Sequence, residues 1–231
     1  MAVLYGVGIG PGDPELLTLK ALRVLQQVPV ICAPHTRQEG ESIAGEIVAA
    51  VLGPEAMQAK EFLTLHFPMT RLKAVLEKAW EEAARQVASR LREGADVAFV
   101  TLGDPSFYST YPYLERAVKV LYPGARTAVI PGVTALAACM AAGGRSVQGN
   151  ERLAVVPVTG TEDLERVVED FDCTVLLKVG RHLDRVREML GRMGLKESAR
   201  LYERCGLEGA RQGPLEEFQG ADYLSLVVVK K

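Results

Sequence analysis

Residues 4–25 read LYGVGIGPGDPELLTLKALRVL, and this stretch decides how the chain is expected to fold. An apolar run over residues 3–9 leads into Gly10-Pro11-Gly12-Asp13-Pro14, and a helical pattern begins at Glu15. The stretch therefore predicts a strand, a tight loop and the N-terminus of a helix. Glycine stands at every second position from 6 to 12, which lets another backbone or a ligand approach closely.

The spacing of these glycines argues against a phosphate-binding loop. No G-x-G-x-x-G can be placed on them, and the sequence has no G-x-x-x-x-G-K-[ST]. Asp13, at the predicted N-cap of the helix, would also repel a phosphate. A ligand bound here is expected to be held by groups other than phosphates.

Two later loops have the same character. The apolar run DVAFVT, residues 96–101, is followed by Leu102 and Gly103-Asp104-Pro105, and the strand-like residues 126–130 are followed by Pro131-Gly132. Three strand ends with such turns would place three loops along the carboxyl edge of one parallel sheet. Open α/β folds bind their ligands at that edge, so the sequence predicts a ligand site there.

The composition is that of an ordinary globular protein. The chain has 231 residues, of which 48% are hydrophobic and 24% charged, which allows one large domain or two small ones. A formal net charge of −2, without a run of five like charges, does not favour nucleic-acid binding. No apolar run approaches the roughly 18 residues of a transmembrane helix, and no signal-peptide pattern opens the chain. We therefore expect a cytoplasmic protein without a membrane partner.

The cysteines do not predict a metal site. Cys32, Cys139, Cys173 and Cys205 lie far apart without a C-x-x-C, and the chain has only three histidines. This is not the ligand spacing of a zinc site. Cys139, in an Ala-rich helix, and Cys173, at the start of a strand, are expected to be reduced core residues.

Strand and helix patterns alternate through the first half of the chain, as is typical of a parallel sheet. The expected strands there are 3–9, 28–33, 60–66 and 95–101, and the expected helices are 15–27, 41–52, 71–93 and about 108–121. In the second half we expect helices 134–142 and 181–193 and strands 126–130, 153–158, 173–179, 199–204 and 221–229, in a mixed sheet. The predicted fold is α/β, with an N-terminal domain over residues 1–122, a C-terminal domain over 123–231 and a ligand cleft between them.

Three signatures in order make the chain similar to a known family. GVGIGPGDPELLTLKA spans residues 6–21, GDPSFYST spans 103–110 and PGVTAL spans 131–136. They resemble the tetrapyrrole methylases, which are S-adenosylmethionine-dependent methyltransferases of the corrinoid and sirohaem pathways. Weaker matches at 178–180 and 203–206 extend the resemblance over essentially the whole chain. GDPSFYSTY and NERLAVVPVTGT (150–161) look most like the members that methylate carbon 20 of precorrin-2 or its cobalt form.

The resemblance implies an enzyme of cobalamin biosynthesis that uses S-adenosylmethionine and releases S-adenosylhomocysteine. The cofactor would lie folded between the domains and be held mostly by backbone groups. Asp104 would pair with its amino group, and the apolar Val179 suits an adenine face. Carried over by motif, the contacts would be Pro11, Leu102, Gly103, Asp104, Phe107, Thr134, Ala135, Val179 and Cys205. Read alone, Gly103-Asp104-Pro105 would be a tight turn with Asp104 as a helix N-cap, but its two companion loops favour the binding role.

Asp104 is also the candidate catalytic residue. Methylation of a bridging carbon creates a cation that must lose a proton, and a nearby carboxylate could accept it. The alternative is that this proton is lost to water. The sirohaem-pathway methylases carry an aspartate just after the second strand, where residues 30–35 here read VICAPH. That departure argues against the sirohaem branch.

The implied substrate carries several carboxylates, so its receptor should supply cations. His35, Arg37 and Lys178 are the candidates for this role, with Tyr108 as a further substrate contact. The resemblance also implies a homodimer. Two alternatives stay open within the family: methylation of another tetrapyrrole carbon, or of a non-tetrapyrrole acceptor such as diphthine or ribosomal RNA. An alternative from another class is a non-catalytic nucleotide-binding module.

Overall fold

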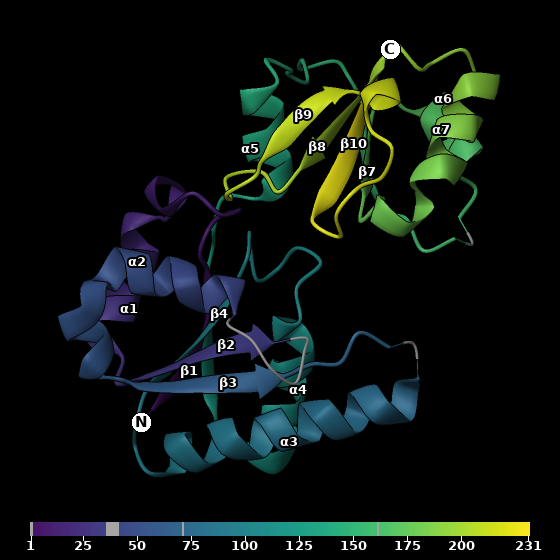
Figure 1. Ribbon diagram of the computed structural model, residues 1–231. Helices are drawn as coiled ribbons and strands as arrows, with labels where there is room; N and C mark the ends of the chain where they lie inside the picture. Colours follow the sequence, from purple (N-terminus) through teal and green to yellow (C-terminus); the bar gives the residue numbers. More distant parts are fainter. Residues whose placement is uncertain (1, 36–41, 71, 161) are drawn as a thin grey trace. The chain divides into compact units, whose positions relative to one another are not determined.

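The computed structural model of the chain describes residues 2–35, 42–70, 72–160 and 162–231, and Figure 1 shows its elements. The chain separates into two compact units, Met1–Thr134 and Ala135–Lys231. Each unit contains its own five-stranded sheet.

The sheet of the first unit is entirely parallel. Its strands are β1 (Val3–Gly8), β2 (Val30–His35), β3 (Glu61–His66), β4 (Val97–Thr101) and β5 (Arg126–Ile130). They lie in the order β3-β2-β4-β1-β5. The central strand β4, VAFVT, is buried at every position, because a parallel sheet is covered on both faces. The carboxyl ends of β4, β1 and β5 therefore lie side by side.

Helices cover both faces of this sheet. Helices α1 (Leu19–Gln27) and α2 (Ile43–Gln58) lie on one side, and α3 (Lys73–Arg92) and α4 (Tyr111–Leu121) on the other (Figure 1). The core beneath α3 and α4 includes Leu4, Val30, Leu65, Val97 and Phe99 from the strands and Val87, Leu91, Tyr111, Leu114 and Val118 from the helices. Each such large apolar side chain contributes about 1.5–3 kcal/mol on burial.

Gly6, in β1, leaves room for a side chain of the core. A Cβ atom at this position would lie 2.6 Å from the ring of Tyr111. The glycine is therefore required by the packing of α4 on the sheet, and the group that approaches it is a side chain of the core.

The sheet of the second unit is mixed. Its strands are β6 (Leu153–Pro157), β7 (Cys173–Leu177), β8 (Ala199–Glu203), β9 (Arg211–Pro214) and β10 (Ser225–Lys230), in the order β6-β7-β10-β8-β9. β6 and β7 pair in parallel, whereas β10 is antiparallel to both β7 and β8, and β8 is antiparallel to β9. The carboxyl ends of β7 and β8 thus lie at the start of β10.

Side chains of β10 alternate between two cores. Val227 and Val229 belong to the core that α6 (Leu164–Asp170) and α7 (Leu183–Arg192) cover. Leu226 and Val228 belong to the core that α5 (Ala135–Ala142) covers. This is the period of two expected of a strand with both faces buried, and it makes the second unit a three-layer structure.

The observed elements confirm the α/β class with one parallel and one mixed sheet. The first helix begins later than the pattern predicts. Residues Pro14–Leu16 form a 3₁₀ turn capped by Asp13, and α1 starts after Thr18, whose hydroxyl accepts the N–H of Ala21. Helix α6 and strand β9 are missed by the sequence pattern, because α6 is short and charged, and RQGP contains residues depleted from strands.

The strand at residues 126–130 lies in a different unit from the one expected. The expected boundary at 122–123 assigns it to the second domain. In the structure, β5 pairs in parallel with β1 over Val3–Val7, so it completes the first sheet, and the compact units divide after Thr134.

The longest helix, α3, carries charged residues along its length. Among the described residues, no helix is both long enough and apolar enough to cross a membrane.

Candidate functional site

Three loops of the first unit meet at the carboxyl edge of its sheet. They follow β1, β4 and β5, and they pack main chain against main chain. A Cβ atom on Gly8 would lie 2.5 Å from the carbonyl oxygen of Gly103 and 2.7 Å from the amide nitrogen of Gly132, and a Cβ atom on Gly132 would overlap the same Gly103 oxygen. Gly8 and Gly132 are therefore required by the contact between the loops.

Hydrogen bonds tie the same loops together. The N–H of Gly103 donates to the carbonyl of Gly10 at 2.7 Å. Oδ1 of Asp104 accepts the N–H of Ser106 at 2.7 Å within its own turn, and Oδ2 accepts the N–H of Gly132 at 3.0 Å from the loop after β5. Bonds from N–H groups to a charged carboxylate are among the stronger ones in proteins. Asp104 thus fastens the second loop to the third.

The charge of these loops favours one kind of ligand. Residues 9–14, 102–110 and 131–134 contain two aspartates, Asp13 and Asp104, and no lysine, arginine or histidine. Oδ1 of Asp13 accepts the N–H of Glu15 at 2.9 Å and so caps the 3₁₀ turn. Carboxylates without compensating cations repel a phosphate and attract a positively charged ligand. The donor set fits an organic cation better than a nucleotide phosphate.

The predicted cofactor residues of the first unit line these loops. Pro11 is buried after β1, whereas Leu102 and Asp104 are partly buried after β4. Phe107 is 39% exposed, and its ring meets that of Tyr108 edge-on with centroids 4.9 Å apart. Thr134 is the last residue of the first unit, and Ala135, the first residue of α5, opens the second unit.

Backbone strain marks three of the loops. Among the described residues, those other than glycine with a positive φ are Tyr108 (53°), Lys178 (58°) and Arg204 (52°), which follow β4, β7 and β8. Such conformations cost about 1–3 kcal/mol each and cluster at ligand sites. Tyr108 and Lys178 are predicted substrate residues, and Arg204 directly precedes Cys205.

In the second unit, the loops after β7 and β8 meet at the start of β10. The N–H of Lys178 donates to the carbonyl of Ser225 at 2.9 Å, and the N–H of Arg204 donates to that of Leu224 at 2.8 Å. Val179 is fully buried in the core that α7 covers. A ligand would therefore reach Val179 through its main chain, because the side chain expected to face an adenine ring is buried.

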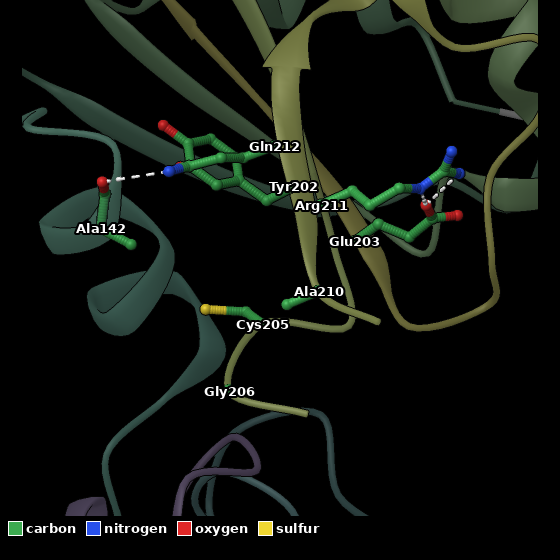
Figure 2. Close-up of a pocket in the computed structure, with 8 residues that line it drawn as sticks. All are labelled: Ala142, Tyr202, Glu203, Cys205, Gly206, Ala210, Arg211 and Gln212. Carbon is green, nitrogen blue, oxygen red and sulfur yellow. Dashed lines mark hydrogen bonds and ion pairs between the residues drawn. The ribbon is translucent and has the colours of Figure 1, made fainter. Parts of the chain in front are cut away.

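A pocket of about 150 Å³ lies beside Cys205 (Figure 2). Gln212 Nε2 donates to the carbonyl of Ala142 at 3.3 Å and so joins β9 to the end of α5. The walls combine an aromatic ring, small residues, a thiol and the charged side chains of Glu203 and Arg211. The full lining is Ala142, Tyr202, Glu203, Cys205, Gly206, Ala210, Arg211 and Gln212.

An ion pair closes one side of this pocket. Glu203 and Arg211 are cross-strand partners, and Nη2 of Arg211 lies 2.5 Å from Oε2 of Glu203, which is buried. The other carboxylate oxygen of Glu203 accepts the N–H of Asp222. The ion pair of Glu203 and Arg211 is not predicted from the sequence, because the residue pattern does not predict β9. The signal that could have located it is the pair of opposite charges on either side of the short turn 204–210.

The predicted substrate residues stand at strand ends or in strained loops. His35 closes β2 and is buried, opposite His66 at the end of β3. Tyr108 is 49% exposed and Lys178 is exposed, whereas Arg37 lies outside the described residues. In the described part of the chain, no three His, Cys, Asp or Glu side chains are grouped as a metal ion would require.

The sequence matches one family model and several curated relatives. Residues 3–219 match the model of the Tetrapyrrole (Corrin/Porphyrin) Methylases. The chain is 34% identical over 236 residues to a probable cobalt-precorrin-2 C(20)-methyltransferase of Methanocaldococcus jannaschii, with 99% of this chain and 96% of that protein covered. It is 35% identical over 239 residues to a precorrin-2 C(20)-methyltransferase of a Sinorhizobium species, with 98% and 94% covered.

Solved structures share the architecture. A cobalt precorrin-4 methyltransferase aligns with a TM-score of 0.75 at 20% identity over 99% of this chain and 94% of that one, a likeness of fold. A uroporphyrin-III C-methyltransferase of Thermus thermophilus, complexed with S-adenosylhomocysteine, aligns with a TM-score of 0.70 at 25% identity over 100% and 92%.

Proposed function

The chain belongs to the tetrapyrrole (corrin/porphyrin) methylase family, and from this premise we propose that it transfers a methyl group from S-adenosylmethionine to carbon 20 of precorrin-2 or of its cobalt form, in cobalamin biosynthesis. The observation that carries the proposal is the near full-length similarity to relatives that are named for this reaction. The three family signatures that meet as packed loops in the first unit support it.

The first-unit loops fit the proposed cofactor. When bound, S-adenosylmethionine supplies a methyl group on a positively charged sulfur. Two carboxylates without a lysine, arginine or histidine nearby in sequence are the right surroundings for that charge. We assign the contacts to Pro11, Leu102, Gly103, Asp104, Phe107, Thr134, Ala135, Val179 and Cys205. For Val179 the contact would be made by the main chain, because its side chain is buried.

The chain's own task in such a reaction is to align two reactants and to exclude water. Loops that pack backbone on backbone suit alignment, because they leave little freedom to move. Asp104 holds two of them together. Its carboxylate has lone pairs beyond those that accept the N–H groups of Ser106 and Gly132, so we keep Asp104 as the candidate acceptor of the proton that carbon 20 loses.

The substrate side of the proposal rests on charge. A macrocycle with several carboxylates needs cationic or hydrogen-bonding partners. We propose His35, Arg37, Tyr108 and Lys178 for this role; strained loops carry Tyr108 and Lys178. The proposal includes a homodimer that works in the cytoplasm.

The test is transfer of labelled methyl from S-adenosylmethionine to precorrin-2 and to cobalt-factor II, side by side. We expect label at carbon 20 of one of them, which identifies the metal state of the natural substrate. Binding of S-adenosylhomocysteine, measured by calorimetry, is the accompanying control.

Each other outcome points to a stated alternative. Label at a different ring carbon would indicate a methylase of the same family that acts on another position of the tetrapyrrole. Binding of S-adenosylhomocysteine without label on either macrocycle would indicate another acceptor. Stabilisation by NAD or ATP but not by S-adenosylhomocysteine would replace the methylase proposal with a nucleotide-binding module.

A further inference from the structure

Two of the four cysteines are paired in space. Cys32 is buried in the first unit, and Cys173 is buried at the start of β7. Cys139, on α5, and Cys205, after β8, are far apart in sequence, yet Cys205 packs against the core cluster that contains Cys139. Both belong to the core between α5 and the sheet, with Cys139 fully inside it and Cys205 at its partly buried margin.

The elements that carry the two thiols are held firmly together. The residue after α5 is Gly143, and a Cβ atom there would overlap the ring and hydroxyl of Tyr202 on β8. Gln212 fastens β9 to Ala142 at the end of α5. In Figure 2, the sulfur of Cys205 is directed toward the helix that carries Ala142. The thiol pair is therefore a fixed feature of the second unit.

The two thiols differ in access and acidity. Cys205 lines the pocket, where small molecules can reach it, whereas Cys139 is only 1% exposed. The hydrogen bond from Cys139 lowers the pKa of Cys205, and the same bond together with burial raises the pKa of Cys139. The thiolate is the reactive form of cysteine. Cys205 is thus suited to attack first. Cys139 follows because of its position in the same core, and its thiol proton leaves with the hydroxide of the sulfenic acid.

We propose that Cys139 and Cys205 form a redox-active pair that a hydroperoxide oxidises to a disulfide and a thiol reductant restores. The Cys205 thiolate attacks the peroxide oxygen, the O–O bond breaks, and Cys205 becomes a sulfenic acid. The departing alkoxide or hydroxide takes a proton from solvent and leaves as an alcohol or water. The Cys139 thiol then attacks the Cys205 sulfur, an S–S bond forms, and water leaves. Two electrons pass from the two sulfurs to the peroxide.

The disulfide would change the pocket, because it draws the Cys205 loop onto α5. This consequence rests on the proposed function, in which Cys205 contacts the cofactor. Oxidation is then expected to weaken binding of S-adenosylhomocysteine by about tenfold or more, an effect that calorimetry resolves easily.

The experiment treats the full chain with a small excess of hydrogen peroxide, blocks free thiols with N-ethylmaleimide and maps peptides by mass spectrometry. We expect one linked peptide pair, containing Cys139 and Cys205, that dithiothreitol reverses. In Cys139→Ala the link is absent, and dimedone captures a sulfenic acid at Cys205. The matched control is Cys173→Ala, which removes a buried cysteine of the same core and should leave the link unchanged.

The readouts separate this proposal from the proposed function. Three results would overturn the thiol pair. They are absence of the linked peptide, oxidation of Cys32 and Cys173 to the same extent as Cys139 and Cys205, and loss of the link in Cys173→Ala. Oxidised protein that binds S-adenosylhomocysteine as tightly as reduced protein would overturn the effect on the pocket. Reduced protein that does not bind S-adenosylhomocysteine would instead count against the cofactor assignment, and the peptide map would still test the disulfide.

Discussion

The two units hold their candidate loops in different ways. In the first unit, backbone packs on backbone at Gly8, Gly103 and Gly132. In the second unit, Gly180 meets the backbone of Ala221 and Asp222, and side chains add further contacts. Tyr202 packs against the end of α5, and Cys205 lies at the margin of the core that contains Cys139. A backbone contact leaves no room for a different residue, whereas a side-chain contact can be replaced by another of similar volume. The side-chain contacts of the second unit are therefore expected to tolerate substitution better than the backbone contacts of either unit.

The largest effect is expected where a side chain is forced between two backbones. Gly132→Ala places a methyl group into the carbonyl of Gly103, and no rotamer change relieves that clash. We expect the free energy of unfolding to fall by about 3 kcal/mol or more, with loss of S-adenosylhomocysteine binding, measured by urea unfolding and calorimetry.

Gly149→Ala is the matched control. No atom lies within 4 Å of the Cβ position of Gly149, so its unfolding free energy should change by less than about 0.5 kcal/mol. If Gly132→Ala and Gly149→Ala lost the same free energy of unfolding, Gly132 would not be packed tightly against the backbone of Gly103.

The next largest effect should come from Asp104. Asp104→Asn replaces an acceptor-only carboxylate with an amide, which has too few acceptors for the N–H groups of Ser106 and Gly132 in this geometry. We expect a loss of about 1–3 kcal/mol in the free energy of unfolding and a higher KM for S-adenosylmethionine.

The other Gly-Asp-Pro turn of the same unit supplies the control for Asp104. Asp13 accepts one local N–H, that of Glu15, and asparagine caps a helical turn about as well as aspartate. Asp13→Asn should therefore cost less than about 0.5 kcal/mol. Unchanged kcat in Asp104→Asn would remove the proposed role of Asp104 as proton acceptor. Equal stability of the two variants would remove its role between the loops.

Much of the fold could be predicted because its signals are local. The strand β4 is an unbroken apolar run, and Gly94 stands directly after α3 and its cap. The turn at Gly103-Asp104 is also local, since Oδ1 of Asp104 reaches an amide only two residues away. These features depend on neighbours in sequence, so the residue pattern is enough to find them.

The features that escaped prediction depend on partners distant in sequence. The sequence indicates that something approaches Gly6, but only the fold shows that it is the ring of Tyr111. Likewise, the second oxygen of Asp104 bonds to Gly132, 28 residues away. The thiol pair has no sequence signature, because α5 and β8 come together only when the second sheet forms.

A smaller effect, with the opposite sign, is expected at Tyr202 in the second unit. Its buried hydroxyl has no hydrogen-bond partner, and an unsatisfied buried polar group is unfavourable. Tyr202→Phe should therefore raise the free energy of unfolding by up to about 1 kcal/mol, measured by urea unfolding. Tyr223→Phe, at a side chain that is 47% exposed, should change nothing measurable. A clear loss of stability in Tyr202→Phe would show that the hydroxyl has a structural role. The side-chain contacts of the second unit would then tolerate substitution less well than we expect.

The smallest effect concerns the loop after β6, which one carboxylate organises. Burial opposes the ionisation of Glu162, but hydrogen bonds from the hydroxyl of Thr159 and from the amides of Thr159 and Gly160 outweigh it and lower its pKa to about 2. A depressed pKa in the folded state stabilises the protein above the unfolded value, 4.5, and the contribution is lost as the pH falls from 4.5 toward about 2.

Glu162→Gln should accordingly be less stable than the parent chain near neutral pH, by about 0.5 kcal/mol after solvent screening. The difference should shrink below pH 4.5 in urea titrations at several pH values. Glu77→Gln on α3, whose carboxylate is 56% exposed and 3.5 Å from Lys73, is the control and should show a smaller difference. A difference for Glu162→Gln that stayed constant with pH would mean that the ionisation of Glu162 does not order the loop.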